Sequence, residues 1–436
     1  MGGAGWTLRR PGRGTLGGGV SVSPARLVAA LDLGTTKVAA VIGEVQGDSR
    51  TLTCRILGVG VERSNGVRRG VVRGIEETTR AIQKAMKDAE RMAGVEVGSV
   101  YCGIAGEHVA GQTSTGVVSV TGGEIRTGDV ARVNDVASSV PLGKEHELLH
   151  AIPQDYLVDM QPGISEPIGM TGSRLDAQVY LVTVLSSVPQ NLRKCVEGAG
   201  YHVAEFVLEP LAASLAVLTP DERELGSAVV ELGGGSTNVA IFQGGKIRHT
   251  GSLLISGGHV TNDIVHGLQV TQQDAEKLKE RSGGAWEPFI PESETIQLPG
   301  TPGQGARTAH RKVLAHIMRM RLQETLEFAL DEITRAGYHQ RLPAGVVLTG
   351  GGAQTPGIVE LAREVFAMPV RVGKPGQNLG GLTDSVESPR FVVVAGLALY
   401  GSRQLVQGAS FGSGKRRSQA VEKWVMPVRQ WLQDFF

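Results

Sequence analysis

The stretch Leu31–Val45 carries the residue types that hold a phosphate group. Two apolar arms flank the polar segment Gly34–Lys37, so the local pattern predicts a β-hairpin. A hairpin alone requires neither the carboxylate of Asp32 beside the turn nor the ammonium of Lys37. In such a turn, backbone N–H groups and hydroxyls can donate to phosphate oxygens, Lys37 adds positive charge, and Asp32 can hold a hydrated Mg²⁺. An ordinary polar hairpin is the alternative that this stretch leaves open.

A second stretch, SAVVELGGGSTNVAIFQGGKI, repeats the pattern of the first. It is also predicted to form a hairpin, again with an acidic residue before a turn rich in glycine and hydroxyls. An internal echo is a stronger observation than either hairpin alone, and it predicts two related halves whose phosphate turns face each other. Aligned on the turn, the corresponding segments are Asp32–Gly34 with Glu231–Gly233, Thr35–Thr36 with Ser236–Thr237, and Val38–Ala39 with Val239–Ala240.

A third glycine-rich turn, LTGGGAQTPG, follows an apolar strand and precedes the helical segment IVELAREVF. Three glycines let the backbone approach a flat ring or a phosphate, because no Cβ intervenes. Such turns occur in many α/β folds, so the order of motifs is the more specific signal. Along the chain come an acidic hairpin, a helix beginning Glu-Pro, a second acidic hairpin, a helix with AEKLK, this turn and a glycine-marked apolar helix.

Composition limits the classes of protein that the chain can belong to. Its 436 residues exceed one typical core, and 41% hydrophobic and 20% charged residues fit a soluble multidomain protein. The net charge of +1 gives no general attraction to nucleic acid. The cysteines Cys54, Cys102 and Cys195 lack metal-binding spacing and are expected to be buried thiols. No apolar run reaches the roughly 20 residues that span a bilayer.

The predicted elements alternate between strands and helices, which indicates an α/β fold. A strand is expected around Ile56–Val61 and a helix over Ile75–Ala93. From Val97 a strand-helix-strand-strand block of about 90 residues looks like a compact insertion, starting with the strand SVYCGIAGEHVAG. Later helices are expected at Thr261–Arg281 and Val313–Ala336, separated by a Gly/Pro-rich loop.

The order of motifs and elements resembles the actin-like ATPase superfamily, over the chain from about residue 27 to 403. The resemblance implies an actin-like (ribonuclease H-like) fold of two domains that close on ATP and Mg²⁺. It also implies residue roles. Those matching the first phosphate turn are Asp32, Gly34, Thr35, Thr36 and Lys37; the second, Glu231, Gly233, Gly234, Gly235, Ser236 and Thr237; the adenosine turn, Gly350, Gly351 and Gly352; and the pair bracketing ribose and base, Glu276 and Lys279.

Two acidic residues bear on ATP hydrolysis. Glu209 matches the position where hydrolysing relatives place a carboxylate near the attacking water, although a glutamate at a helix start is also favoured by the helix dipole. Asp32 and Glu231 are the residues expected to hold Mg²⁺ through water. The superfamily usually has aspartate where this chain has Glu231, and the extra methylene puts efficient hydrolysis in doubt without affecting ATP binding.

Within the superfamily, the inserted block resembles the small domain of the bacterial division family FtsA. The stretches GVVRGIEETTRAIQKAMKDAERMAG, GGKIRHTGSLLISGGHVTNDIVHGL and GLTDSVESPRFVVVAGLALYG agree with that family. The resemblance implies a protein that binds ATP, polymerises head to tail, and holds the tubulin-like FtsZ at the cytoplasmic face of the inner membrane at the division site, where later division proteins are recruited. A phosphotransferase and a scaffold of another envelope machine, such as pilus assembly, are the alternatives.

The domain organisation follows from the elements and this resemblance. The expected units are a disordered extension (1–26), a first actin-like domain 1A (27–96, 187–222 and 381–403), an inserted subdomain 1C (97–186), a second actin-like domain 2A (223–258 and 340–380), subdomain 2B (259–339), a flexible linker (404–414) and an amphipathic helix (415–436).

The last 22 residues, KRRSQAVEKWVMPVRQWLQDFF, form one apolar stripe at helical spacing beside a basic cluster. Such a stripe could dock on the body, but the preceding linker and the Trp and Phe residues favour an anionic membrane surface. Pro427 is expected to kink the helix or to start it. The residues predicted to contact lipid are Lys415, Arg416, Arg417, Trp424, Val425, Val428, Trp431, Leu432, Phe435 and Phe436.

A basic amphipathic helix, HRKVLAHIMRMRLQETLEFALDEI, lies where the family receives the C-terminal peptide of FtsZ. Arg319, Arg321 and Glu324 are the residues expected to grip such a mixed-charge peptide. The alternative for each of them is an ordinary solvated helix face.

Overall fold

The computed structural model describes residues 26–48, 51–300 and 305–410. Its first sheet has six strands. From edge to edge they are β11 (His202–Leu208), β6 (Ser99–Ile104), β1 (Arg26–Leu33), β2 (Lys37–Gln46), β3 (Thr53–Arg63) and β19 (Leu379–Gly381). The hairpin β1–β2 and the strand β3 are antiparallel neighbours, whereas β6 and β11 run parallel to β1. The predicted first hairpin and the strand after it are therefore present.

Helices cover both faces of this sheet because successive residues of a strand point to opposite sides. In β1, Ala29 and Leu31 belong to a core with one helix pair, whereas Val28 and Ala30 belong to a core with the other pair. The helices are α1 (Ile75–Ala93) and α3 (Ser187–Gly198) on the first side, and α4 (Glu209–Val217) and α10 (Val392–Ser410) on the second.

Helix α1 has the predicted bounds and ends at Gly94, whose φ of 69° forms a left-handed cap. Ile82, Met86 and Ala89 form its apolar face and are buried, whereas Ile75 is exposed in the first turn. Burial of the face at i, i+4 and i+7 fixes the helix on the sheet.

The second sheet has five strands and repeats the hairpin arrangement of the first. Its order is β14 (Lys246–Leu253), β13 (Thr237–Gln243), β12 (Ser227–Leu232), β17 (Val346–Thr349) and β18 (Val370–Val372). One face packs on α6 (Gly257–Leu268), α7 (Gln272–Ser282), α8 (Arg311–Arg335) and α9 (Ile358–Phe366). The other face shares a core with α4, so α4 is buried between the two sheets.

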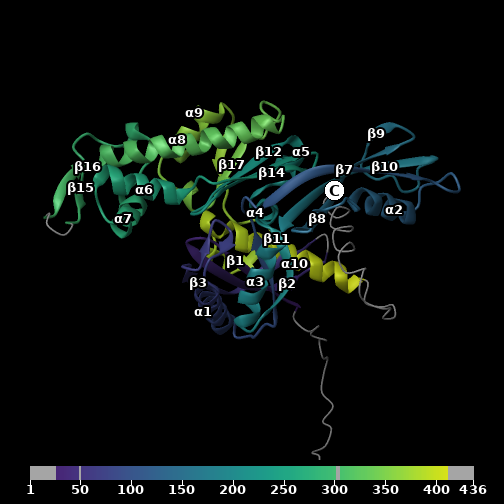
Figure 1. Cartoon of the computed structure of the whole chain (residues 1–436), viewed down its shortest axis with the longest axis horizontal. Helices are drawn as coiled ribbons and strands as arrows, with labels where there is room; N and C mark the ends of the chain where they lie inside the picture. The colour runs from purple at the N-terminus through teal and green to yellow at the C-terminus, as the bar shows by residue number, and fades with distance from the viewer. Residues whose placement is uncertain (1–25, 49–50, 301–304, 411–436) are drawn as a thin grey trace, which may run out of the picture.

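The inserted block is a separate layer of sheet and helix, seen on the right in Figure 1, opposite the arm of α6–α8. Its sheet has the order β7 (Val109–Ser119), β10 (Arg174–Leu185), β8 (His146–Val158) and β9 (Gln161–Ile164), and it packs on α2 (Thr127–Ser138). The predicted start at residue 97 is wrong. The strand placed there, β6, pairs with β1 and β11 of the first sheet, and the inserted sheet starts only with β7.

Two further predictions about elements are corrected. The single helix expected over Thr261–Arg281 is split into α6 and α7, because Gln269 takes a left-handed φ of 49° and the Thr271 side chain caps α7. The flexible linker expected over 404–414 is wrong up to residue 410, because α10 continues to Ser410. Val406 is buried and Leu405 is partly buried against the core, and this packing overrides the glycine and serine content of the segment.

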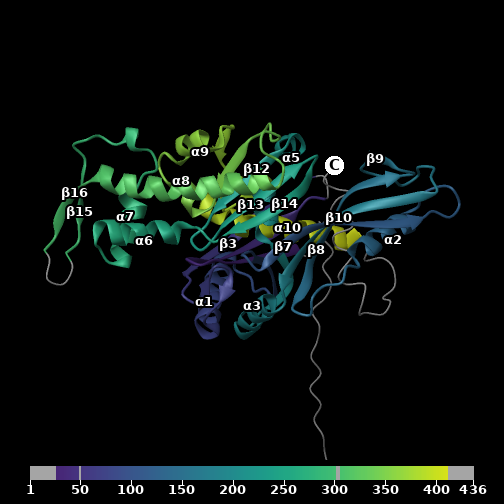
Figure 2. The same cartoon turned by 45° about the horizontal axis from the view of Figure 1, so that its top comes forward.

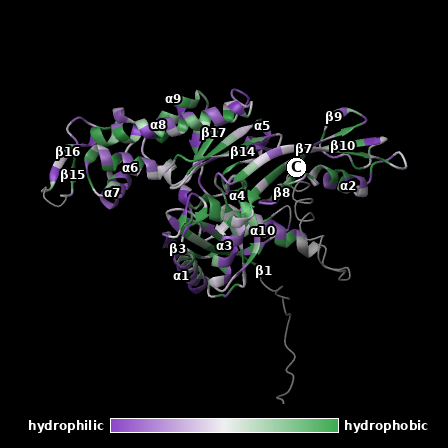
Figure 3. Cartoon of the chain, viewed as in Figure 1, coloured by the Kyte–Doolittle hydropathy of each residue, from purple (hydrophilic) through white to green (hydrophobic). Residues whose placement is uncertain are grey.

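The remaining elements are short connections around these layers, and Figure 2 shows the arms of the molecule from a second direction. Hydrophobic residues gather in the central strands and α4, and polar residues on the outer helices (Figure 3). None of the described helices is long and apolar enough to cross a bilayer. The short elements are β4 (Val67–Arg68), β5 (Val71–Val72), α5 (Pro220–Leu225), η1 (Glu287–Phe289), β15 (Thr295–Leu298), β16 (Arg307–His310), η2 (Gly351–Gln354), η3 (Thr383–Ser385) and η4 (Pro389–Phe391).

Candidate functional site

The first hairpin turn carries a buried ion pair. Leu33 pairs with Val38 in the ladder, so residues 34–37 form the turn. Lys37 Nζ lies 2.6 Å from Asp32 Oδ2, and these side chains are only 15% and 6% exposed. The charge that the sequence predicted for a phosphate is therefore held in place by the acidic residue at the end of β1.

The second turn has the same register but different chemistry. Leu232 pairs with Thr237, so residues 233–236 form this turn. Glu231 faces no lysine of its own turn; its Oε2 accepts a hydrogen bond of 3.1 Å from the Asn238 amide. The first turn thus supplies a charge and the second only small residues.

This register corrects the predicted alignment of the two turns. Thr237 corresponds to Val38 and not to Thr36, and Ser236 corresponds to Lys37. The Thr237 hydroxyl is fully buried and donates to the carbonyl of Ile255 at 2.8 Å, so it belongs to the ladder and does not line the turn. The alignment required a gap that the structure does not contain.

The two turns pack directly against each other. A Cβ on Gly234 would lie 2.4 Å from Cγ2 of Thr36, and one on Gly235 would lie 2.1 Å from Oγ1 of Thr35. Only glycine permits this approach, because any side chain would overlap the hydroxyl residues of the first turn. The predicted meeting of the turns from the two halves is present in the structure.

Three carboxylates gather around Lys37. Glu209 begins α4, and its pKa is raised well above the ordinary range by burial first, then by the charges of Asp32 and Glu231. Burial, followed by the charge of Asp32, raises the pKa of Glu231 to about 7, although the Asn238 hydrogen bond opposes the shift. Lys37 lowers both pKa values, but one cation does not balance three carboxylates.

The third glycine turn adjoins the base of the second hairpin. Gly350 has a left-handed φ of 81°, and a Cβ there would lie 2.7 Å from the carbonyl oxygen of Leu232. A Cβ on Gly352 would lie 2.7 Å from Cβ of the same leucine. Gly351, in contrast, has no atom within 4 Å of its Cβ position, so its outer side is open.

The pair predicted to bracket a ribose and base is joined to the second turn. Lys279 Nζ donates to Glu276 Oε2 at 2.8 Å and to the carbonyl oxygen of Gly257 at 3.2 Å. The Gly257 N–H in turn donates to the carbonyl of Gly233 at 2.9 Å. Glu276 and Lys279 of α7 therefore connect through the start of α6 to the second turn.

Sequence reasoning missed two residues at the meeting of the turns. The Arg69 N–H donates to Thr35 Oγ1 at 3.1 Å, and its guanidinium lies 3.4 Å from Nε2 of His259 on α6. Neither residue belongs to a recognised phosphate-binding pattern, and only the position of Arg69 beside Gly70, typical of a tight turn, was a signal.

A third residue missed by sequence reasoning supports Glu209. His150 lies in β8 of the inserted block, and its Nε2 accepts a hydrogen bond of 3.0 Å from the N–H of Leu208, the residue before Glu209. Burial lowers the pKa of His150 to about 4, so the ring is neutral at physiological pH. The inserted block therefore contacts the start of α4.

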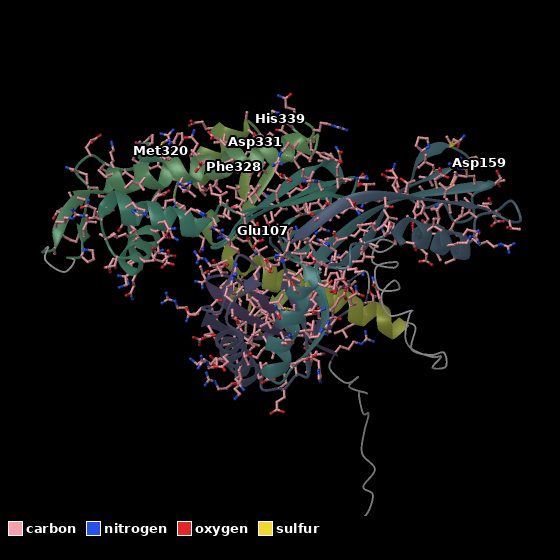
Figure 4. The ribbon with its side chains drawn as sticks, viewed as in Figure 1. Glu107, Asp159, Met320, Phe328, Asp331 and His339 are labelled. Carbon is pink, nitrogen blue, oxygen red and sulfur yellow. The ribbon has the colours of Figure 1, made fainter. Side chains whose placement is uncertain are left out.

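The residues predicted to bind a partner lie on α8, away from the turns. Arg319 lies 3.5 Å from Glu364 and over the ring of Trp286. Arg321 pairs with Asp263 at 2.5 Å and also with Glu324. Sequence reasoning missed the apolar part of this surface, because Met320 and Phe328 are 55% and 45% exposed. Figure 4 labels both residues on the same helix.

The residues predicted to contact the membrane lie outside the described residues. So do residues 1–25 of the predicted extension and 411–414 of the predicted linker.

The described residues fit ATP with a hydrated Mg²⁺. The glycines of the turns place no side chain between the backbone and a ligand, and the outer side of Gly351 is open. Together with the ammonium group of Lys37, these features suit a nucleotide and its phosphates. The described parts of the chain hold no cluster of three or more His, Cys, Asp or Glu placed to bind a metal ion directly. Mg²⁺ usually keeps several water ligands, which Asp32 and Glu231 would then contact.

Comparisons with known families agree with this architecture. The model of the family "Cell division protein FtsA" matches residues 228–396, and that of the "SHS2 domain inserted in FTSA" matches residues 106–183. The second range contains β7, β8, β9 and most of β10, and it excludes β6, in accord with the corrected boundary.

Relatives of known name cover almost the whole chain. The cell division protein FtsA of Pseudomonas aeruginosa is 39% identical over 423 residues, which are 95% of this chain and 100% of that protein. FtsA of Escherichia coli K12 is 36% identical over 424 residues, 96% of this chain and 100% of that protein.

Solved structures show the fold. The PilM-PilN type IV pilus biogenesis complex aligns with a TM-score of 0.62 and 16% identity, covering 87% of this chain and 99% of that one. MreB5 of Spiroplasma citri bound to ADP aligns with a TM-score of 0.52 and 13% identity, covering 89% and 99%. The actin-like fold expected from the sequence is confirmed, and the identity over nearly the full length shows that this chain belongs to the FtsA family of cell division proteins.

Proposed function

We propose that this protein is an ATP-binding, polymerising actin homologue that holds the FtsZ ring at the cytoplasmic membrane and helps to assemble the division machinery. The observation that carries the nucleotide part is the direct contact between the two hairpin turns, beside three carboxylates and one lysine. Family membership over nearly the full chain supports the division part.

In this proposal each turn binds the phosphates in a different way. Lys37 and the hydroxyls of Thr35 and Thr36 donate to phosphate oxygens from the first half. The small turn of Gly233–Ser236 brings backbone N–H groups close to the same phosphates from the second half. Asp32 and Glu231 would contact the water ligands of a Mg²⁺ ion, which would supply positive charge for the phosphates.

The adenosine part of the nucleotide lies on the third turn. Gly351 is open on the side away from Leu232, so a flat ring can lie against its backbone. Glu276 and Lys279 hold each other at 2.8 Å, which fixes both side chains for hydrogen bonds to the ribose and base.

The state of Glu209 favours binding over rapid hydrolysis. Burial, and next the charges of Asp32 and Glu231, raise the pKa of Glu209 well above its ordinary range, which disfavours the carboxylate form that would accept a proton from the attacking water. Added positive charge near Glu209 would lower this pKa and favour the carboxylate, as the charge of Lys37 already does. We infer at most a slow ATPase, with the protein acting as an adaptor that forms head-to-tail filaments.

The proposed FtsZ site is the exposed face of α8. Arg321 and Glu324 present both charges, and the exposed Met320 and Phe328 flank them along the helix. A peptide with mixed charge and apolar residues can displace the pair of Arg321 with Glu324, because half-exposed pairs contribute little to stability.

The proposed membrane anchor is the amphipathic segment 415–436. Its basic residues would contact anionic headgroups and its Trp and Phe residues the interface. A single short anchor binds weakly, and polymerisation would add many anchors to one surface.

Flotation with anionic vesicles tests the whole proposal. The full chain, a chain that ends at Gly414 and a full chain with Trp431→Glu are each mixed with FtsZ. We expect only the full chain to float and to carry FtsZ with it. The variant Phe328→Ala should float but release FtsZ, which separates the two surfaces.

Two results would contradict the proposal. If the shortened chain floats like the full one, the terminal segment is not the anchor. If the full chain floats without FtsZ, the adaptor role fails, and the phosphotransferase and other-scaffold alternatives are favoured.

A further inference from the structure

A tight hairpin next to the phosphate turns carries an arginine in an unusual backbone conformation. The strands β4 and β5 pair Arg68 with Val71, so Arg69 and Gly70 form a two-residue turn. Both residues are left-handed, with φ of 53° and 76°. This turn normally takes Asn, Asp or Gly at its first position, and an arginine there strains the backbone. Strain of this kind is retained where the side chain has a use.

The backbone of Arg69 lies where the two phosphate turns meet. Its N–H donates to Thr35 Oγ1 of the first turn at 3.1 Å. A Cβ on Gly235 of the second turn would lie 3.2 Å from the same nitrogen. Arg69 is therefore in contact with the first turn and adjacent to the tip of the second. The adenosine turn, in contrast, contacts Leu232 at the base of that hairpin.

The charge of Arg69 has no acidic partner. Within residues 26–48, 51–300 and 305–410, no carboxylate oxygen lies within 4.0 Å of its guanidinium, and its side-chain contact is Nε2 of His259 at 3.4 Å. Burial, and next the charge of Arg69, lower the pKa of His259, so this partner is a neutral ring. The preceding residue, Arg68, carries the same charge at the end of β4 and is exposed.

We propose that Arg69 binds the terminal phosphate of a nucleoside triphosphate and so makes the site prefer the triphosphate to the diphosphate. The inference rests on the proposed nucleotide site. The phosphate chain runs from the adenosine turn at Leu232 towards the tip at Gly235, and Arg69 stands at that tip. A guanidinium can give two parallel hydrogen bonds to one phosphate.

The same contact would respond to the nucleotide state. Arg69 belongs to the first half and His259 to the second, so the guanidinium joins the halves through a neutral ring. A terminal phosphate would give this guanidinium a charged partner between the halves, and loss of that phosphate would leave it only the ring nitrogen. The hairpin β4–β5 would then report which nucleotide is bound.

Competition binding with the full chain tests the inference. A fluorescent ATP analogue is displaced by ATP or ADP, each with Mg²⁺, from the wild type and from Arg69→Asn, Arg69→Lys and Arg68→Asn. Asparagine tolerates the left-handed conformation, so Arg69→Asn removes the charge and keeps the turn. Arg68→Asn removes the same charge from the exposed neighbour and is the matched control.

We expect Arg69→Asn to weaken ATP binding 10- to 50-fold and ADP binding less than threefold. Arg69→Lys should recover part of the ATP affinity, and Arg68→Asn should leave both affinities unchanged. If Arg69→Asn weakens ATP and ADP equally, the residue only joins the halves, and the inference is wrong. Unchanged affinity for both nucleotides also overturns it.

A further variant separates this inference from the proposed function. Gly351→Asp places a charge on the open side of the adenosine turn and should abolish binding of both nucleotides. If the wild type binds both nucleotides and Gly351→Asp binds them equally well, the site assigned to adenosine is wrong, whatever Arg69 does. If Gly351→Asp loses both nucleotides but the Arg69 variants bind them like the wild type, the nucleotide site stands and the proposed contact with the terminal phosphate is wrong.

Discussion

The two hairpin turns share a register but contribute different things to one site. The first places Lys37 beside Asp32 at 2.6 Å, and the second has Ser236 at the corresponding position. The second is instead rich in glycine, and its backbone approaches Thr35 and Thr36 closely. The first half therefore supplies the positive charge of Lys37, and the second supplies a glycine-rich turn whose backbone can come close to the first turn.

This difference also explains the carboxylates. Asp32 has a cation within its own turn, whereas Glu231 has only an amide, and burial raises its pKa to about 7. Two corresponding positions thus hold an acid that is paired with a cation and an acid that is not. Positive charge that arrives with a ligand would lower the pKa of Glu231, because a nearby opposite charge favours the carboxylate.

The largest expected effect comes from removing the charge of the first turn. Lys37→Met leaves three acidic groups without their cation and should lower the free energy of unfolding by about 3 kcal/mol at pH 8. The matched change in the second turn, Ser236→Ala, should cost less than about 0.5 kcal/mol. Urea unfolding of both variants measures the difference. Equal losses of unfolding free energy in the two variants would show that the two turns contribute equally to stability.

The second prediction concerns His150, which supports Glu209 of the first half from the inserted block. Its pKa of about 4 in the folded protein lies below the ordinary value of 6.5, so the unfolded chain binds the proton first as the pH falls. The stabilisation of the folded state by the neutral ring of His150 is complete above pH 6.5 and is lost as the pH falls towards 4. By pH 4.5 the loss should reach about 2 kcal/mol.

His150→Gln tests this sign, because the glutamine oxygen can accept from Leu208 N–H but does not titrate. The stability of the variant should fall less between pH 7 and 4.5 than that of the wild type. His202→Gln, at an exposed position, is the control and should keep the wild-type slope. A wild-type slope in His150→Gln would mean that another group causes the acid instability.

The smallest expected effect concerns the close approach of the second turn. Gly234→Ala should lower the free energy of unfolding by about 1 kcal/mol, because its Cβ would lie 2.4 Å from Cγ2 of Thr36. Thr36→Ser removes that methyl and should restore most of the loss in the double variant. Additive losses in this double-mutant cycle would show that the turns do not touch in solution.

Local patterns predicted many elements correctly. Helix α1 has the predicted bounds because one apolar face at helical spacing and a following glycine are enough to define it. The hairpin of β1 and β2 was likewise readable from its arms and turn. Composition failed at residues 404–410, where burial of Val406 in the core, rather than glycine content, decides that α10 continues.

The candidate site was predictable in its motifs but not in its contacts. The glycines and acidic residues of the turns were found by type and spacing, whereas Thr237 was assigned to the turn although it lies in the ladder. Only pairing between strands fixes that register. The membrane residues remain predictions, because they lie outside the described residues.

The sequence by itself determined which residues could bind a phosphate, and their order along the chain indicated the family. Only the tertiary structure decided which of them meet. His150 and Leu208 are 58 positions apart, and Arg69 and His259 are 190 apart. Neighbour spacing cannot encode such contacts. They arise because two sheets pack on opposite sides of the buried helix α4, and that packing brings both turns to one place.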